Sequence, residues 1–169
     1  MARRVLITVV AALHLVLADA VTKELAIGYL KGERPVDLIP GFFGLAYVEN
    51  RGASWGMFQG HVWPLAVFGV AALAFLIWKR RDLFLAGDRT WRGRVGAFAE
   101  TFLYAGIVGN LIDRFCRGCV IDFVHCHWRD AWHFPCFNLA DIFITAAAAM
   151  LVVLAFAVPK NAAKKENDA

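Results

Sequence analysis

Two aspartates in apolar surroundings are the residues of this sequence best suited to catalysis. Asp122 lies in the middle of the apolar run 120–124, and Asp141 lies four residues after Phe137. Neither has a basic residue at helical spacing that would neutralise it. If the two carboxyl groups meet in a poorly solvated site, they cannot both ionise easily, so the pair shares one proton. The ionised member then takes a proton from water and the protonated member polarises a peptide carbonyl, as in aspartic proteases.

A second group of polar residues lies near the ends of long apolar stretches. Asp19 and Lys23 are four residues apart and therefore share one face of a helix, and Asn110, Asp113 and Arg114 share another. Charged side chains inside a membrane pair with one another or face the interior of a helix bundle. We expect these charges to form structural ion pairs, at the same end of the bundle as Asp141.

The composition explains why such charges are informative. Of 169 residues, 60% are hydrophobic and 19% are charged, against about 45–50% and about 25% in ordinary soluble domains. Disorder is excluded for most of the chain by this apolar content, and 14 Gly and 4 Cys exclude collagen-like and disulfide-scaffold classes. The sequence therefore indicates an integral membrane protein.

Four apolar stretches are long enough to cross a bilayer as helices, at about 5–26, 62–78, 95–115 and 137–158. Eleven of the 18 basic residues lie before the first stretch, between the second and third, or after the fourth. The positive-inside rule therefore places both termini in the cytoplasm and the loops 27–61 and 116–136 in the periplasm. A cleaved secretory signal at the N-terminus is the competing interpretation, but the first apolar stretch continues past Ala20.

The predicted fold class is an all-α membrane protein, with four transmembrane helices and a small β-like periplasmic subdomain. The β-like part comes from the runs 35–39 and 45–49, which are separated by Pro40, Gly41 and Gly44. We expect one membrane domain over 1–158 and a disordered cytoplasmic tail over 159–169. The net charge of +4 follows from the membrane topology and does not indicate nucleic-acid binding.

The second periplasmic loop is rich in thiols and imidazoles. Its cysteines are Cys116, Cys119, Cys126 and Cys136, and zinc binding, disulfide pairing and free thiols all remain open. A quinone-linked thiol oxidase also has four helices and a CxxC motif, but its two cysteine pairs would lie in two loops, and it leaves the aspartates unexplained. A proton-coupled carrier is a third class, but four short spans without repeat symmetry argue against it.

Five motifs in a fixed order resemble those of the lipoprotein signal peptidases, the bacterial type II signal peptidases. They are Asp19-Ala-Val-Thr-Lys23, Asn50-Arg-Gly-Ala-Ser-Trp-Gly56, Gly106-Ile-Val-Gly-Asn-Leu-Ile-Asp-Arg114, Gly118-Cys-Val-Ile-Asp-Phe123 and Phe137-Asn-Leu-Ala-Asp141. The main departure is Ala20, where the family usually has Gln.

The resemblance implies an aspartyl endopeptidase of the bacterial inner membrane, with its active site near the periplasmic face. Its substrates would be prolipoproteins that carry diacylglycerol on the lipobox cysteine, cut just before that cysteine. It implies catalysis by Asp122 and Asp141, and structural support from Asp19, Lys23 and Asp113. The substrate-binding positions that it implies are Asn50, Gly52, Asn110, Arg114 and Asn138. We expect no metal, no cofactor and no nucleic-acid partner, contact with membrane lipid, and a monomer.

The expected topology makes a direct prediction for reporter fusions. A periplasm-dependent reporter should be active when it is inserted within 27–61 and inactive when it is fused after Lys165. A cytoplasm-dependent reporter should give the opposite pattern. Reversed activities would place the aspartates at the wrong face of the membrane.

Overall fold

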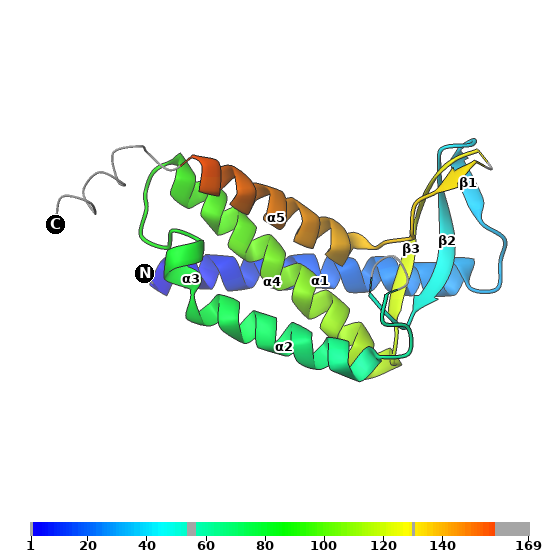
Figure 1. Ribbon diagram of the computed structural model, residues 1–169, viewed down its shortest axis with the longest axis horizontal. Helices are drawn as coiled ribbons and strands as arrows, with labels where there is room; N and C mark the ends of the chain where they lie inside the picture. The colour runs from blue at the N-terminus through cyan, green and yellow to red at the C-terminus, as the bar shows by residue number, and fades with distance from the viewer. Residues whose placement is uncertain (1, 54–56, 130, 158–169) are drawn as a thin grey trace.

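A long central helix organises the molecule. In a computed structural model that describes residues 2–53, 57–129 and 131–157, helix α4 (Trp91–Arg117) packs against the three other long helices. These are α1 (Ala2–Leu30), α2 (Val62–Trp78) and α5 (Leu139–Phe156). Figure 1 shows the four helices running along the long axis, with the sheet at one end and the N-terminus at the other. The predicted tail 159–169 and the motif residues 54–56 lie outside the described residues.

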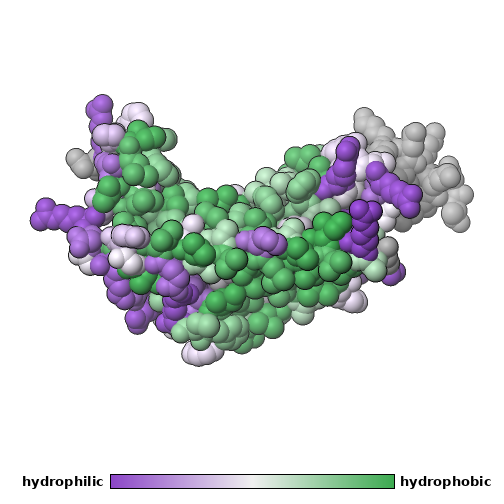
Figure 2. Space-filling view, turned by 180° about the vertical axis from the view of Figure 1, so that it is seen from behind, coloured by the Kyte–Doolittle hydropathy of each residue, from purple (hydrophilic) through white to green (hydrophobic). Residues whose placement is uncertain are grey.

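The helices have the length and polarity of a membrane protein. Helices α1, α4 and α5 are each long and apolar enough to cross a bilayer, while α2 is a shorter apolar helix of 17 residues. At 1.5 Å per residue α2 is about 26 Å long, close to the ~30 Å of a hydrocarbon core. Figure 2 shows apolar residues over the middle of one face, with hydrophilic residues gathered mainly at its two ends. Each apolar stretch predicted from the sequence is therefore helical, although α1 and α4 continue beyond the predicted limits.

A four-stranded antiparallel sheet covers the end of the helix bundle. It contains β1 (Val36–Ile39), β2 (Phe43–Asn50), β3 (Val120–Trp128) and β4 (Trp132–His133), in that spatial order. The hairpin of β1 and β2 confirms the two β-like runs of the first loop. The description of the fold as all-α is incomplete, because the loop 116–136 contributes two more strands. The run 120–128 is rich in β-branched and aromatic residues, and it pairs with the free edge of β2.

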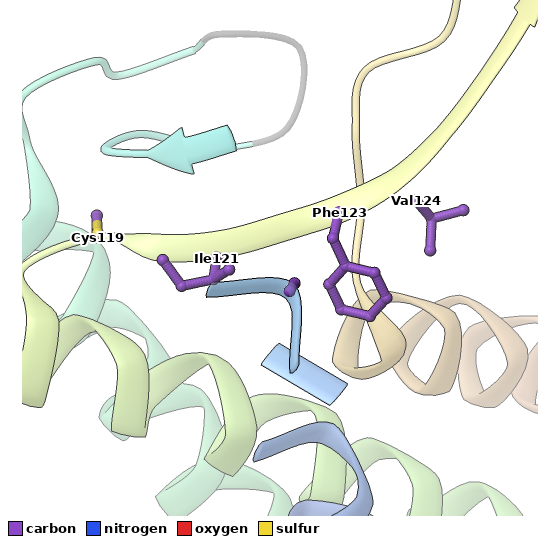
Figure 3. Close-up of a cluster of buried hydrophobic side chains, with 5 residues drawn as sticks. Cys119, Ile121, Phe123 and Val124 are labelled. Carbon is purple, nitrogen blue, oxygen red and sulfur yellow. The ribbon is translucent and has the colours of Figure 1, made fainter. Parts of the chain in front are cut away.

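The apolar residues of β3 fix which way its aspartate faces. Ile121 and Phe123 point from the strand toward the helix ends, where Ile121 packs in a buried cluster with Ala26 of α1 (Figure 3). Successive side chains alternate across a strand, so Asp122 faces the other side. A slip of one residue would exchange the two faces, and burial of Ile121 and Phe123 therefore sets the position of the carboxylate.

The opposite end of the bundle carries its own buried charge. Glu100 of α4 is fully buried and pairs with Arg80 Nη2 at 2.7 Å and with Arg4 Nη2 at 3.8 Å. Arg80 begins the short helix α3 (Arg80–Leu83), which connects α2 to the segment before α4. Polar clusters therefore lie at both ends of the bundle, and the apolar middle separates them.

Candidate active site

Asp122 is held from two sides by amide groups. Asn138 Nδ2 donates to Asp122 Oδ1 at 2.7 Å, and Asn50 Nδ2 donates to Asp122 Oδ2 at 3.1 Å. Asn50 ends β2 and Asn138 precedes α5, so the carboxylate on β3 is fixed by two neighbouring segments. Only 2% of Asp122 is exposed. Its position is therefore determined before any substrate arrives.

Asp141 is positioned by the start of helix α5. Asn138 is the N-cap: its side chain accepts from the Asp141 backbone N–H at 3.0 Å, and Asp141 Oδ2 accepts from the Asn138 N–H at 3.3 Å. This reciprocal capping box satisfies two N–H groups that the helix end leaves unpaired. Asn110 Nδ2 of α4 donates to Asp141 Oδ1 at 2.8 Å. The positive end of the helix dipole also favours a negative charge in the first turn.

One asparagine connects the two carboxyl groups. The Asn138 side chain donates to Asp122 and accepts from the Asp141 backbone, and it is fully buried. The two predicted aspartates are 19 positions apart in the sequence and belong to β3 and α5, and this asparagine links them. Burial, together with the negative charge of Asp141, raises the pKa of Asp122 to about 7. Asp122 is therefore the member of the pair whose environment favours the protonated form.

A buried ammonium group is connected to Asp141 through Asn110. Lys23 Nζ lies 2.8 Å from Asp19 Oδ2 and 2.9 Å from Asp113 Oδ2, and it donates to Asn110 Oδ1 at 3.2 Å. Asn110 in turn is the donor that holds Asp141. The predicted structural residues Asp19, Lys23 and Asp113 are each 1% exposed, and they lie directly behind the catalytic candidates.

The network continues into the backbone of the surrounding elements. Asp19 Oδ1 accepts from the Ala140 N–H of α5 at 2.9 Å, and Asp113 Oδ2 accepts from the Ile121 N–H of β3 at 3.1 Å. Asp113 Oδ1 also pairs with Arg117, on the next turn of α4. Each buried carboxylate therefore has several partners, as buried charges require.

Arg114 brings a positive charge to the wall of the site. Its Nη2 donates to the Gly52 carbonyl at 3.2 Å, and its Nη1 donates to the Asn110 carbonyl at 3.3 Å. The Gly52 N–H donates to Asn50 Oδ1 at 2.9 Å. A Cβ atom at Gly52 would lie 2.5 Å from the Met57 carbonyl, so the loop after β2 closes in this form only around glycine.

Both aspartates open into one cavity of about 570 Å³. Its polar wall consists of Asn50, Asn110, Arg114, Asp122 and Asp141. Its apolar wall descends along α5 through Ile142, Thr145, Ala146 and Ala149, which repeat at helical spacing. Gly52 and Asn138 are not among the described residues that line this cavity. A polar end with paired carboxyl groups therefore continues into an apolar channel about 10 Å long, counted over seven residues of helix.

Several residues of the cavity were not predicted as site residues. The α5 residues carry a signal in the sequence, since a run of small side chains, at 145–149, follows Asp141 by about one helical turn. The rim is formed by Phe134, Pro135, Cys136 and Phe137. Nothing in their types indicates a site, because their place depends on the bridge that pairs Val124 with Phe137.

The cysteines of the second loop are free thiols, and its histidine rings stack on one another. All four cysteines are free, and burial raises the pKa of Cys136 to about 11, so its reactive thiolate form is disfavoured. The rings of His125, His127 and His133 stack face to face. Within the described residues, no group of three or more His, Cys, Asp or Glu side chains is placed to hold a metal.

Comparison with known proteins identifies the family. Residues 11–157 match the family model Peptidase_A8, described as signal peptidase (SPase) II. The chain belongs to this family. It is 34% identical to the lipoprotein signal peptidase of Symbiobacterium thermophilum over 146 residues, which cover 86% of this chain and 91% of that protein. The lipoprotein signal peptidase of Ectopseudomonas mendocina is 33% identical over 153 residues, covering 88% and 86%.

Solved structures agree with this assignment at the level of the fold. One described as a bacterial membrane enzyme superposes with a TM-score of 0.74 at 25% identity, covering 90% of this chain and 94% of that one. A second of the same description gives 0.66 at 26% identity, covering 88% and 87%. Signal peptidase II is an aspartic peptidase that cleaves signal peptides from prolipoproteins. Family membership therefore confirms the predicted reaction and decides against the thiol oxidase and the carrier.

The burial of Lys23 predicts a large effect of its removal. Lys23→Met leaves the Asp19 and Asp113 carboxylates buried without their shared cation. This change should lower the free energy of unfolding by about 3–5 kcal/mol. Thermal unfolding of the detergent-solubilised protein measures this loss.

Lys31→Met is the matched control, because the Lys31 side chain is 57% exposed and its ion pair with Glu49 and its cation–π contact with Tyr47 lie at the surface. It should leave the unfolding temperature nearly unchanged, because exposed ion pairs contribute little to stability. An unchanged unfolding temperature for Lys23→Met would show that the ammonium group does not hold the site together.

Proposed function

We propose that Asp122 and Asp141 are the catalytic pair of this signal peptidase II. We propose further that it cuts diacylglyceryl-prolipoproteins just before the lipidated cysteine. The observation that carries the assignment is the link through Asn138, which fixes both carboxyl groups at the wall of one cavity. No other pair of acidic side chains among the described residues lines that cavity.

The surroundings of the two groups suggest different roles for them. Asp141 lies in the first turn of α5 and accepts from the Asn110 side chain and from a backbone N–H, so it is suited to be the carboxylate that activates water. Asp122, whose pKa is raised to about 7, is suited to carry the shared proton and to polarise the scissile carbonyl. Water attacks the carbonyl carbon while Asp141 takes one proton from that water. The C–N bond of the tetrahedral intermediate then breaks, and a carboxyl proton of the pair passes to the leaving amine.

The polar residues around the pair divide into two groups by exposure to the cavity. Asn50, Asn110 and Arg114 line it, so they are suited to bind an extended substrate backbone. Asn138 and Gly52 do not reach it, and we propose that they position Asp122, Asp141 and Arg114 instead. Asp19, Lys23 and Asp113 act one layer further away, through Asn110 and the backbone of α5 and β3.

The apolar wall of the cavity is suited to the lipid part of the substrate. Thr145, Ala146 and Ala149 leave space along α5 where larger side chains would fill it. A diacylglyceryl group attached to cysteine can lie in this channel and keep its acyl chains within the membrane. The peptide bond before that cysteine would then lie at the polar end, beside the carboxyl groups.

Placement in the membrane follows from the same arrangement. We propose four spans, with α2 as the shortest, in a single membrane domain over 1–158. Both termini lie in the cytoplasm, and the sheet and the catalytic pair lie at the periplasmic face of the inner membrane. A monomer suffices for this mechanism, because every side chain that we assign to it comes from one chain.

Conservative replacement of either aspartate tests the assignment. Asp122→Asn and Asp141→Asn should each lower the rate of cleavage by about 10³-fold, since an amide cannot exchange the shared proton. The measurement is cleavage of a diacylglyceryl-prolipoprotein by the reconstituted enzyme, together with the unfolding temperature of each variant.

Asp82→Asn provides the control, because Asp82 is an exposed carboxylate on α3 whose ion pair with Lys79 lies at the surface. Its activity should equal that of the unmodified enzyme. Normal cleavage by either of the other two variants would overturn the proposed pair.

The raised pKa of Asp122 predicts a fall in activity at high pH. Below about 7 the Asp122 carboxyl keeps its proton, whereas above that pH both groups are ionised and no acid remains to polarise the carbonyl. The rate of cleavage under kcat/KM conditions should therefore decline as the pH rises through about 7.

The variant Asn50→Ala tests whether the decline in activity moves along the pH axis in the expected direction. The Asn50 amide donates to Asp122 Oδ2 and so lowers the pKa of that carboxyl. Its removal should move the decline to higher pH, whatever it does to KM. A decline that stays in place, or moves to lower pH, would show that Asp122 does not carry the functional proton.

A further inference from the structure

A second cavity lies at the end of the bundle away from the sheet. It has a volume of about 830 Å³ and lies between α1 and α4. Its walls are mostly apolar and include Ile7, Ala11, Ala97 and Phe98. The proposed peptidase mechanism uses no residue of this cavity.

Three arginines stand at the mouth of this cavity. Arg3, Arg4 and Arg89 all line it, although Arg3 and Arg4 come from the start of α1 and Arg89 from the segment before α4. Arg4 is engaged: its Nη atoms donate to the Leu85 and Phe84 carbonyls. Its Nε is shielded from solvent and has no hydrogen-bond partner among the described residues.

The other two guanidinium groups are uncommitted. Arg3 and Arg89 are both exposed, and neither forms a hydrogen bond or ion pair within 2–53, 57–129 and 131–157. Glu100, the buried acid of this end, already pairs with Arg80 and Arg4. The cavity therefore has an excess of positive charge at its mouth. A guanidinium group matches the geometry of a phosphate, to which it can donate two parallel hydrogen bonds.

The dimensions of the cavity fit one leaflet of a bilayer. Its α1 wall extends from Arg3 to Leu15, twelve residues or about 18 Å of helix. Half of a ~30 Å hydrocarbon core is about 15 Å. The arginines stand at the terminus of a membrane helix, where lipid headgroups lie, and the apolar wall descends from them toward the bilayer centre.

We propose that this cavity is a binding site for an anionic phospholipid. The phosphate lies between Arg3 and Arg89 at the mouth, and one acyl chain lies between α1 and α4 against Ala11 and Ala97. A basic rim joined to an apolar channel between membrane helices is the combination that selects anionic lipids. A soluble anion would use the rim alone and would leave the channel unexplained.

Binding of two lipids with identical acyl chains tests the site. Native mass spectrometry of the detergent-solubilised full chain would measure the affinity for dioleoyl-phosphatidylglycerol and dioleoyl-phosphatidylcholine. The unmodified protein should bind phosphatidylglycerol at least about fivefold more tightly, because only this lipid has a net negative headgroup.

Charge variants separate a defined site from general attraction. Arg3→Gln combined with Arg89→Gln should remove the preference for phosphatidylglycerol, with little effect on phosphatidylcholine. Arg94→Gln is the control, since Arg94 is an exposed arginine of the same end of α4 that does not line the cavity. It should keep the preference. Equal loss in Arg94→Gln, no loss in the double variant, or no preference in the unmodified protein would each overturn the proposal.

The acyl-chain part of the site has its own test. Ala97→Phe places a ring in the channel and should weaken phosphatidylglycerol binding at least about fivefold, with an unchanged unfolding temperature in the absence of added lipid. Glycerol phosphate, which has the anionic group without acyl chains, should not displace the bound lipid at equal concentration. Displacement by glycerol phosphate, or unchanged binding by Ala97→Phe, would show that the cavity takes a phosphate alone.

Discussion

The burial of the Lys23 ammonium group is the constraint on which the rest of the site depends. A single positive charge lies between Asp19 on its own helix and Asp113 on α4. In a medium of low dielectric constant such a charge is costly unless ion pairs and hydrogen bonds surround it. The partners of its two carboxylates belong to α5 and β3, which carry Asp141 and Asp122. Four elements, α1, α4, β3 and α5, are therefore tied to one point.

Charge balance explains why this cluster tolerates burial. Lys23 and Arg117 face the two buried carboxylates Asp19 and Asp113, and Arg117 also pairs with the exposed Glu24. The buried part of the supporting layer therefore has a cation for each carboxylate. In the layer above, a pair of carboxyl groups that shares one proton has a single negative charge, and Arg114 supplies one positive charge at the same cavity. Full ionisation of both aspartates would disturb this balance. This balance fits the proposed catalytic pair, since aspartic peptidase chemistry needs one proton shared by two carboxyl groups.

The sequence was sufficient to predict the helices, the hairpin and most of the polar cluster. Twenty apolar residues in succession have few alternatives to a membrane helix, and charges such as Asp19 and Lys23 stand out against that background. The sequence could not predict that β3 joins the sheet, because the pairing of Val48 with Asp122 is a contact between two loops. It also could not separate Asn138 from the residues that face the cavity, since an asparagine that binds a substrate and one that fixes a carboxylate have the same local sequence. Those distinctions arise only from packing across elements.

The close packing around α4 connects the separate parts of the structure. A Cβ atom at Gly106 would lie 2.5 Å from the Ala140 carbonyl, and one at Gly109 would lie 2.6 Å from Asp19 Oδ2. These glycines let α5 and α1 approach α4 closely enough for Asn110 to reach Asp141 and Lys23 together. Ten residues earlier on the same helix, Glu100 holds the other end of the bundle through Arg80 and Arg4. Buried charges therefore anchor both ends of α4, one beside the proposed catalytic pair and the other beside the basic cavity. Hydrolysis needs water, whereas a lipid-anchored substrate needs hydrocarbon, and the cavity at this end of the bundle joins a polar wall to an apolar one.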